Sequence, residues 1–292
     1  MTKCNLCNHR CNVDRSIKLG FCKAPNYLVV AKAYLHKWEE PIITGHNGSG
    51  TIFFSYCNLG CIYCQNYEIS INHQGKKISI DRFSDICLEL QAKGATNINL
   101  VTPTHYVLFI KEGIKKAKNK GLTIPIVYNT STYETVETIK LLDGIVDIYL
   151  PDLKYYDDNL AIKYSKAPNY YENAIKVIEE MYHQVGKPVI KNKIMQKGLI
   201  VRHMMLPTHL EDSKKIINYL YNTYKNNIYI SIMSQYTPIR KCKYEELNSK
   251  INKEDYNKLI DYAYDLGIRK AFIQEEDSCS ESFIPKFDNE GI

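Results

Sequence analysis

The sequence lacks any apolar run approaching the roughly 20 residues that a membrane-spanning helix needs. Its first residues, Met1-Thr2-Lys3-Cys4, also lack the apolar core of a secretory signal peptide. These two absences predict a cytoplasmic chain with no membrane partner.

Strong charge of one sign is missing as well. The net charge of +6 is small for 292 residues, and lysines are interspersed with acidic residues. A nucleic-acid-binding stripe is therefore not indicated. Tryptophan occurs once against 24 tyrosines, which we interpret mainly as compositional bias. The length allows one large domain with a substantial core, or two small ones.

What the sequence does have is cysteine. Ten cysteines in a chain without an export signal favour metal ligation over disulfides. Three of them, Cys57, Cys61 and Cys64, follow a run of β-branched and aromatic residues, 51–56, that predicts a buried strand. Three closely spaced thiolates can hold three irons of a 4Fe–4S cube and leave the fourth iron open for another ligand.

The Cys-x3-Cys-x2-Cys spacing, with Tyr63 just before the last cysteine, resembles the signature of the radical S-adenosylmethionine (SAM) superfamily. This resemblance implies that the open iron binds the amino and carboxylate groups of SAM, with Tyr63 in the cofactor site. An electron from the reduced cluster would then break the sulfonium bond, and the 5′-deoxyadenosyl radical would abstract a hydrogen atom. The alternatives are a zinc knuckle with a distant fourth ligand, or three incidental thiols.

A second cysteine group occupies the N-terminal segment: Cys4, Cys7, Cys11 and Cys22. Four thiols with little apolar sequence between them predict a small metal-binding knuckle. Zinc and an auxiliary iron–sulfur cluster are both chemically reasonable, and unligated structural cysteines are the alternative. We expect residues 1–45 to form this knuckle and its lead-in, and residues 46–292 to form the main domain with a C-terminal tail.

After the central cysteines, segments whose apolar residues repeat with a helical period alternate with segments that have a strand pattern. Strands are predicted at 97–101, 124–128, 146–150, 198–206, 227–233 and 270–273. Helices are predicted at 81–94, 107–121, 133–142, 169–184, from 208 onward, and 252–267. This alternation implies a parallel sheet with right-handed crossovers. The fold class is therefore α/β, an open partial (β/α)6 TIM-like barrel with a small N-terminal Cys-rich metal-binding segment.

Parallel barrels place their chemistry at the carboxyl ends of their strands. Polar side chains stand at several predicted strand ends: Thr102, Thr104, His105, Asn129, Thr130, Asp152, Lys154 and Arg202. Before the barrel, a strand at 28–34 leads into Glu39 and Glu40, which either face the site or form a solvated turn.

Further segments resemble a branch of pyruvate formate-lyase activating enzyme homologues: 36–45, 99–105, 128–133, 147–155, 198–207, 231–238 and the tail 283–288. By position, Asp152 resembles the aspartate of the family's Asp-x-Lys motif, which binds a monovalent cation near SAM. Arg202 resembles an arginine that lines the SAM site, and Asn129 and Thr130 would lie beside Asp152. Where the family often has a glycine-rich motif contacting the SAM amino group, this chain has Thr102, Thr104 and His105.

Three departures make glycyl-radical activation doubtful. The chain has Gly48-Ser49-Gly50-Thr51 in place of the activases' Gly-x-Arg element. Asn66-Tyr67 replaces an Asn-Pro, and Gln235-Tyr236 stands where a late histidine is expected.

We therefore expect a radical SAM enzyme, an activase-like oxidoreductase that takes electrons from a flavodoxin or ferredoxin. Its substrate would be a protein or a small molecule. The alternative is a non-catalytic iron–sulfur or zinc metalloprotein that acts in electron transfer or as a scaffold.

Overall fold

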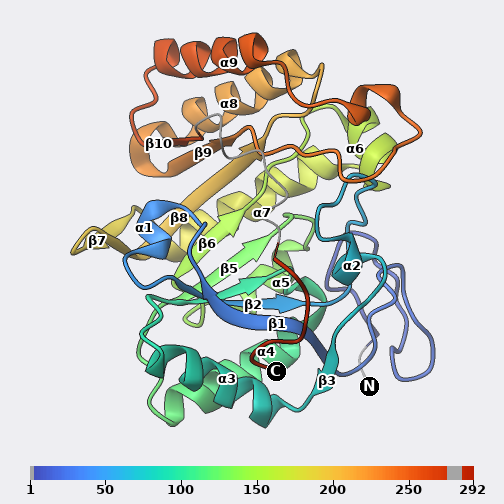
Figure 1. Cartoon of the computed structure of the whole chain (residues 1–292), viewed down its shortest axis with the longest axis vertical. Coiled ribbons are helices and arrows are strands. Elements are labelled where there is room, and N and C mark those ends of the chain that lie inside the picture. The colour runs from blue at the N-terminus through green and yellow to red at the C-terminus, as the bar shows by residue number, and fades with distance from the viewer. Residues whose placement is uncertain (1–2, 275–284) are drawn as a thin grey trace.

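The computed structural model describes residues 3–274 and 285–292, and its core is one curved, mostly parallel sheet (Figure 1). The parallel strands are β2 (Ser49–Phe54), β4 (Ile98–Val101), β5 (Ile126–Thr130), β6 (Ile148–Pro151), β8 (Ile194–Met204), β9 (Tyr229–Met233) and β10 (Ala271–Ile273). They are ordered β10-β9-β8-β6-β5-β4-β2, and each neighbouring pair is parallel. The sheet does not close on itself, which confirms the predicted open partial barrel.

Helices cover the outer face of this sheet. They are α3 (Ile80–Ala92), α4 (Val107–Asn119), α5 (Val136–Lys140), α6 (Asp158–Ser165), α7 (Tyr170–Val185), α8 (Leu210–Tyr224) and α9 (Lys253–Leu266). Two short helices, α1 (Pro41–Thr44) and α2 (Tyr67–Ser70), flank the first strands, and 3-10 turns span Thr104–Tyr106, Lys225–Asn227 and Glu245–Asn248. Each long helix buries one apolar stripe, as α7 does with Ala174, Ile178 and Met181.

Local signals set several helix ends. The Asn252 side chain accepts hydrogen bonds from the backbone N–H groups of Glu254 and Asp255, and Gly267 ends α9 with a φ of 100°, which confirms both predicted boundaries. The helix predicted to begin at Tyr133 begins at Val136 instead. The Thr135 side chain caps it by accepting from the Thr138 N–H, and this leaves Glu134 buried in the preceding turn.

An antiparallel strand extends the barrel sheet beyond β2. This strand, β1 (Leu28–His36), pairs with β2 on one side and with β3 (Lys76–Ile78) on the other. The C-terminal tail also binds β1, because the Lys32 ammonium pairs with Asp288 and Glu290, each at 2.9 Å. Residues 283 and 284 of the tail motif lie outside the described residues.

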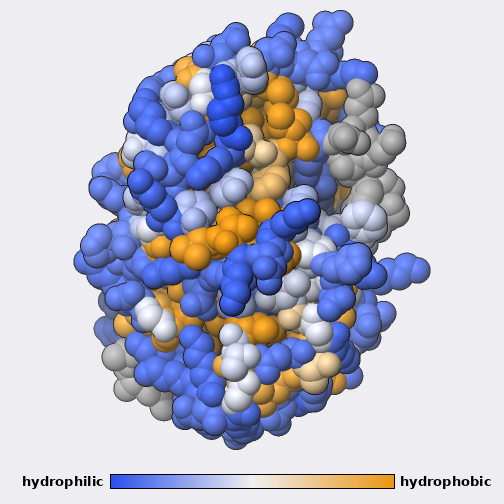
Figure 2. Space-filling model, turned by 90° about the vertical axis from the view of Figure 1, so that its left-hand side faces the viewer, coloured by the Kyte–Doolittle hydropathy of each residue, from blue (hydrophilic) through white to orange (hydrophobic). Residues whose placement is uncertain are grey.

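The surface gives no sign of a transmembrane helix: across residues 3–274 and 285–292, no helix has both the length and the apolarity to span a bilayer. Figure 2 views the side on which α1 and the hairpin strand β7 (Val189–Lys191) lie in Figure 1. A band of hydrophobic residues crosses this face between hydrophilic ones. Val189 and Ile190 of β7 are among the exposed hydrophobic side chains.

Candidate functional site

A cavity of about 260 Å³ opens at the carboxyl ends of the parallel strands. Its polar lining is His36, Glu39, Cys61, Tyr63, Cys64, Gln65, Asn66, Asn129, Asp152, Lys154, Arg202, Gln235 and Thr237. Trp38, Phe53, Val101, Met204, Met233 and Pro285 complete the wall. The cavity lies at the end of the barrel where this architecture places its chemistry.

The three central cysteines follow β2 on the loop that forms one wall of the cavity. Each sulfur accepts a hydrogen bond: Cys57 from the Leu59 N–H at 3.4 Å, Cys61 from the Ser165 hydroxyl at 3.0 Å, and Cys64 from the Ser70 hydroxyl at 3.3 Å. Burial raises the pKa of Cys57 to about 12, and neighbouring Cys61 and Cys64 add to the rise. A positive group beside this loop is therefore needed to stabilise the thiolate form of its cysteines.

A chain of hydroxyl groups continues from Cys61. Ser165 lies 2.6 Å from the Tyr155 hydroxyl, which lies 2.6 Å from the Tyr63 hydroxyl. Burial raises the pKa of both tyrosines well above the ordinary range, so both phenols stay protonated. This series of hydrogen-bonded hydroxyl groups links the loop that carries the central cysteines (the cluster loop) to the end of β6 and to α6.

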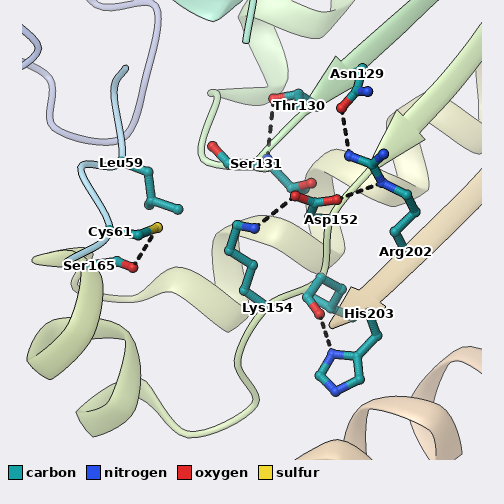
Figure 3. Close-up of polar contacts among 12 residues, drawn as sticks. Leu59, Cys61, Asn129, Thr130, Ser131, Asp152, Lys154, Ser165, Arg202 and His203 are labelled. Atoms are coloured by element: carbon teal, nitrogen blue, oxygen red, sulfur yellow. Dashed lines mark hydrogen bonds and ion pairs between the residues drawn. The ribbon is translucent and has the colours of Figure 1, made fainter. Parts of the chain in front are cut away.

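A group of buried charges faces the cysteines across the cavity. Asp152 accepts from the Lys154 ammonium at 2.8 Å with one oxygen and from Arg202 Nε at 2.8 Å with the other. Arg202 also donates to the Asn129 side-chain oxygen at 2.7 Å. Figure 3 shows Lys154 between Cys61 and Asp152. The two cations hold the pKa of Asp152 below its ordinary value, against the effect of burial.

Two further acids approach Arg202 from the loop after β1. Glu39 accepts from the Asn99 side chain at 3.0 Å and lies 3.5 Å from Arg202 Nη1. Glu40 is buried, and its Oε2 has no hydrogen-bond partner among the described residues. Burial is the main cause that raises the pKa of both carboxyls, and Arg202 opposes the rise. With Asp152 and Lys154 included, three acids face two cations.

Four predicted cofactor contacts do not line this cavity. Thr102 adopts a φ of 57°, which turns the chain so that Thr104 and His105 point into the interior. Thr104 and Thr130 both donate to the buried carboxylate of Glu134. His105 Nε2 lies 2.8 Å from the Ser55 carbonyl, while its Nδ1 has no partner among the described residues. These side chains stabilise the turn beneath the strand ends.

The N-terminal cysteines lie together beside this turn. Cys4, Cys7, Cys11 and Cys22 line one enclosed cavity, and Asn58, Thr104 and His105 form its barrel-side wall. Backbone pairing between Cys7 and Glu134 attaches the segment to the barrel.

A basic groove of about 760 Å³ connects the two cysteine groups on the outside of the molecule. Cys22 and Cys57 both line it, whereas Cys61 and Cys64 line the central cavity. Its cations are Lys23, Lys166, Arg240, Lys241 and Lys243, and no Asp or Glu lines it among the described residues. Cys57 therefore faces the basic groove, and Cys61 and Cys64 face the central cavity.

Sequence reasoning missed several residues that line or support the site. Ser165 and Tyr155 lie far from the cysteines in sequence, and although Tyr155 ends the resembling segment 147–155, neither residue was singled out. His36 and Trp38 precede the two glutamates, so the dense run of acid and aromatic residues at 36–41 was the available signal.

The three central thiols form a donor set that suits an iron–sulfur cluster. Among residues 3–274 and 285–292, no group of three or more His, Cys, Asp or Glu side chains is arranged to hold one metal ion. A cube does not require convergence on one point, because each thiolate binds a different iron. Three thiol sulfurs that each accept a hydrogen bond suit the anionic ligands of such a cluster.

Comparisons with known proteins agree with this site. Residues 51–220 match the radical SAM superfamily. An uncharacterized protein of Methanocaldococcus jannaschii, MJ0674, is 30% identical over 275 residues, which cover 89% of this chain and 74% of that protein.

Solved structures show the same fold. Streptococcus suis SuiB bound to the precursor peptide SuiA has a TM-score of 0.54 at 14% identity, covering 75% of this chain and 47% of SuiB. The FeFe-hydrogenase maturase HydG of Carboxydothermus hydrogenoformans has a TM-score of 0.50 at 14% identity, covering 80% of this chain and 56% of HydG. The chain thus spans about half the length of these structures. Because the family match covers more than half of its residues, the chain belongs to the radical SAM superfamily, and this membership implies cleavage of SAM at an iron–sulfur cluster.

Proposed function

We propose that the chain is an activase-like radical SAM oxidoreductase whose 4Fe–4S cluster is held by Cys57, Cys61 and Cys64. When bound, the cluster and SAM supply a 5′-deoxyadenosyl radical that abstracts a hydrogen atom from the substrate. The observation that carries the proposal is one cavity, lined by Cys61 and Cys64 on one side and by the buried charges around Asp152 on the other.

The charge balance of this cavity supports SAM as its ligand. Glu39, Asp152, Lys154 and Arg202 line the cavity, and Glu40 is buried near Arg202 outside the lining. These five groups together carry an excess of one negative charge when all are ionised. SAM carries a sulfonium, an ammonium and a carboxylate, and therefore a net charge of +1. Lys154 and Arg202 are the donors available to the carboxylate oxygens of SAM, and Glu39 and Asp152 are the acceptors available to the N–H groups of its amino nitrogen, which would also bind the open iron. Binding SAM would neutralise a group that is costly to bury with unbalanced charge.

The apolar part of the wall supports radical chemistry. Phe53, Val101, Met204 and Met233 line the same cavity as the charges. Their side chains exclude water from the reacting region, which limits side reactions of a reactive intermediate. Gln65 and Gln235 link the cluster loop to the end of β9, because the Gln65 amide donates to the Gln235 carbonyl at 2.7 Å.

The cavity rim favours a polypeptide over a small molecule as substrate. Trp38, which lines the cavity, is 63% exposed. Exposed tryptophan at the edge of a concave site is typical of surfaces that bind proteins. A polypeptide segment entering the cavity is the mode of action that an activase-like enzyme needs.

The basic groove supports an acidic electron carrier as partner. Lys23, Lys166, Lys241 and Lys243 form no ion pair with the described acidic residues, so their charges are available to a partner. The groove reaches Cys57 and shares no lining residue with the central cavity. A flavodoxin or ferredoxin docked there would approach the cluster without blocking SAM or substrate, and its acidic surface would be steered by these cations.

SAM cleavage is the test of this function. The reconstituted protein, reduced with dithionite under anaerobic conditions, is expected to convert SAM to methionine and 5′-deoxyadenosine. A carrier or a zinc scaffold would form neither product. The absence of both, with the cluster's absorbance present, would contradict the proposal.

A further inference from the structure

The N-terminal cysteines lie near backbone N–H groups. Cys11 accepts from the Phe21 N–H at 3.2 Å. Burial raises the pKa of Cys7 and Cys22, and the backbone N–H groups of His9 and Ala24 oppose that rise. Backbone donors near three of four neighbouring sulfurs suit anionic thiolates, because N–H groups stabilise negative charge on sulfur.

Asn58 connects this site to the central cysteines. It follows Cys57 in the sequence, and it lines the cavity formed by the four N-terminal cysteines. Asn58 is 0% exposed, yet neither its amide nitrogen nor its oxygen has a hydrogen-bond partner among the described residues. An amide buried without partners is unfavourable by a few kcal/mol. A group bound in the cavity would supply the missing partner.

We propose that Cys4, Cys7, Cys11 and Cys22 hold a second 4Fe–4S cluster and that the Asn58 amide donates a hydrogen bond to one of its sulfur atoms. Zinc would also accept four thiolates, but it carries no electrons. The position favours a redox group, because Cys22 lies in the basic groove and Asn58 adjoins Cys57. Cys22 and Cys57 both line this groove, so the second cluster lies beside the central cysteines at the same docking surface.

The role of this cluster is to pass single electrons, and that role rests on the function proposed above. One electron enters from the acidic donor, which is oxidised, and one electron leaves to the central cluster, which is reduced. No bond forms or breaks in this transfer. Existence of the second cluster does not depend on SAM cleavage, so the two proposals can fail separately.

Metal and sulfide analysis tests the cluster directly. The full chain, reconstituted with iron and sulfide in the presence of zinc, is expected to bind about eight irons and eight sulfides. Cys4→Ser/Cys7→Ser should lower both contents to about four. The complementary Cys57→Ala/Cys61→Ala/Cys64→Ala variant should also retain about four of each. One zinc without sulfide in this last variant would overturn the proposal, as would equal iron contents in the first two proteins.

The Asn58 contact has its own readout. Hydrogen bonds to cluster sulfurs raise the reduction potential, so Asn58→Leu in the chain lacking the central cysteines should lower the potential of the remaining cluster. Ser70→Ala in the same background is the matched control, since Ser70 donates to Cys64 in the central group. An Asn58→Leu potential equal to that of the control would refute the contact.

Discussion

Asp152 and Arg202 form a parallel bridge between the ends of β6 and β8, and their side chains pair at 2.8 Å. The backbone contact continues one residue further, where the Leu153 N–H donates to the Arg202 carbonyl at 2.8 Å. Lys154 pairs with the other Asp152 oxygen at 2.8 Å. Asp152 therefore positions both cations of the cavity.

Replacing Asp152 should weaken SAM binding. Asp152→Ala leaves Lys154 and Arg202 without their shared partner and removes an acceptor from the cavity. We expect SAM affinity to fall by about 1–3 kcal/mol, while the cluster's absorbance stays intact. Calorimetric titration of reconstituted protein measures this. Asp261→Ala, on the exposed face of α9, is the control. Equal affinity in Asp152→Ala and the parent would show that the aspartate is only structural.

Replacing a central cysteine should affect SAM cleavage, whereas replacing a buried cysteine outside the site should affect only stability. Cys61→Ala is expected to abolish both the central cluster and SAM cleavage. Cys87→Ala removes a fully buried thiol of α3 and should lower the free energy of unfolding by about 1 kcal/mol while leaving cleavage unchanged. Product analysis by chromatography and denaturant unfolding give the two readouts. Normal SAM cleavage by the Cys61→Ala protein would contradict the assignment of Cys61 as a cluster ligand.

Glu39 should make the free energy of unfolding of the ligand-free protein decrease as the pH rises. Its pKa is higher in the folded chain than in the unfolded chain, so the folded chain holds the proton more tightly. Stability without ligand therefore falls as pH rises from the ordinary carboxyl pKa of about 4.3 to the raised value. Glu39→Gln lacks this fall and should be the more stable free protein at neutral pH. Unfolding curves at several pH values test this.

The same substitution should weaken SAM binding, because it removes one negative charge from the cavity lining. Stability and affinity thus change in opposite directions. Glu179→Gln, on the surface of α7, should change neither. A Glu39→Gln protein that binds SAM as tightly as the parent would exclude Glu39 from the cofactor site.

Two serines should raise the reduction potential of the central cluster to different extents. Ser165 donates to Cys61 at 3.0 Å inside the protein, and Ser70 donates to Cys64 at 3.3 Å in a less buried position. Both Ser165→Ala and Ser70→Ala should lower the cluster's reduction potential, with the larger effect from Ser165. Potentiometric titration followed by electron paramagnetic resonance measures the order. The reverse order would show that burial does not strengthen the Ser165 contact.

Charge reversal in the basic groove should impair reduction by a protein donor only. Lys241→Glu/Lys243→Glu is expected to slow flavodoxin-driven SAM cleavage about tenfold or more at low salt, and high salt should shrink the difference. Dithionite-driven cleavage should not change. Lys191→Glu/Lys193→Glu, in the β7 hairpin, is a control with the same spacing and charge change. Equal slowing by both pairs would mean that net charge, not the groove, steers the donor.

Sequence patterns predicted the barrel well because each unit repeats a local period. The strands from 97 to 273 appear within a few residues of their predicted ranges, and the apolar stripes of α3, α4 and α7 are the buried faces. The pairing of β1 with β2 and β3 was not predictable, since an isolated apolar strand carries no signal for its partners.

The site was predicted only in part, for a related reason. Asp152, Lys154, Asn129 and Arg202 meet in one cavity because parallel strands end at the same edge. Thr104 and His105 do not join them, because Thr102 adopts a left-handed conformation that no residue pattern announced. The positions of the tyrosines were not predictable either. The composition shows how many there are, but it does not show that Tyr155 and Tyr170 are buried with their hydroxyl groups hydrogen-bonded beside the charges.

The attachment of the tail to β1 orders the assembly of the cofactor site in time. Lys32 donates to the carbonyl of Lys286, 254 residues later in the chain, and Phe287 packs on Phe53 at 5.5 Å between ring centroids. Pro285 and Phe53 both line the central cavity. Since translation delivers these tail residues long after the cysteines, one wall of the cavity stays open until the barrel has been synthesised. A cluster inserted on the nascent chain would therefore meet an unfinished site, which the arrival of the tail would close.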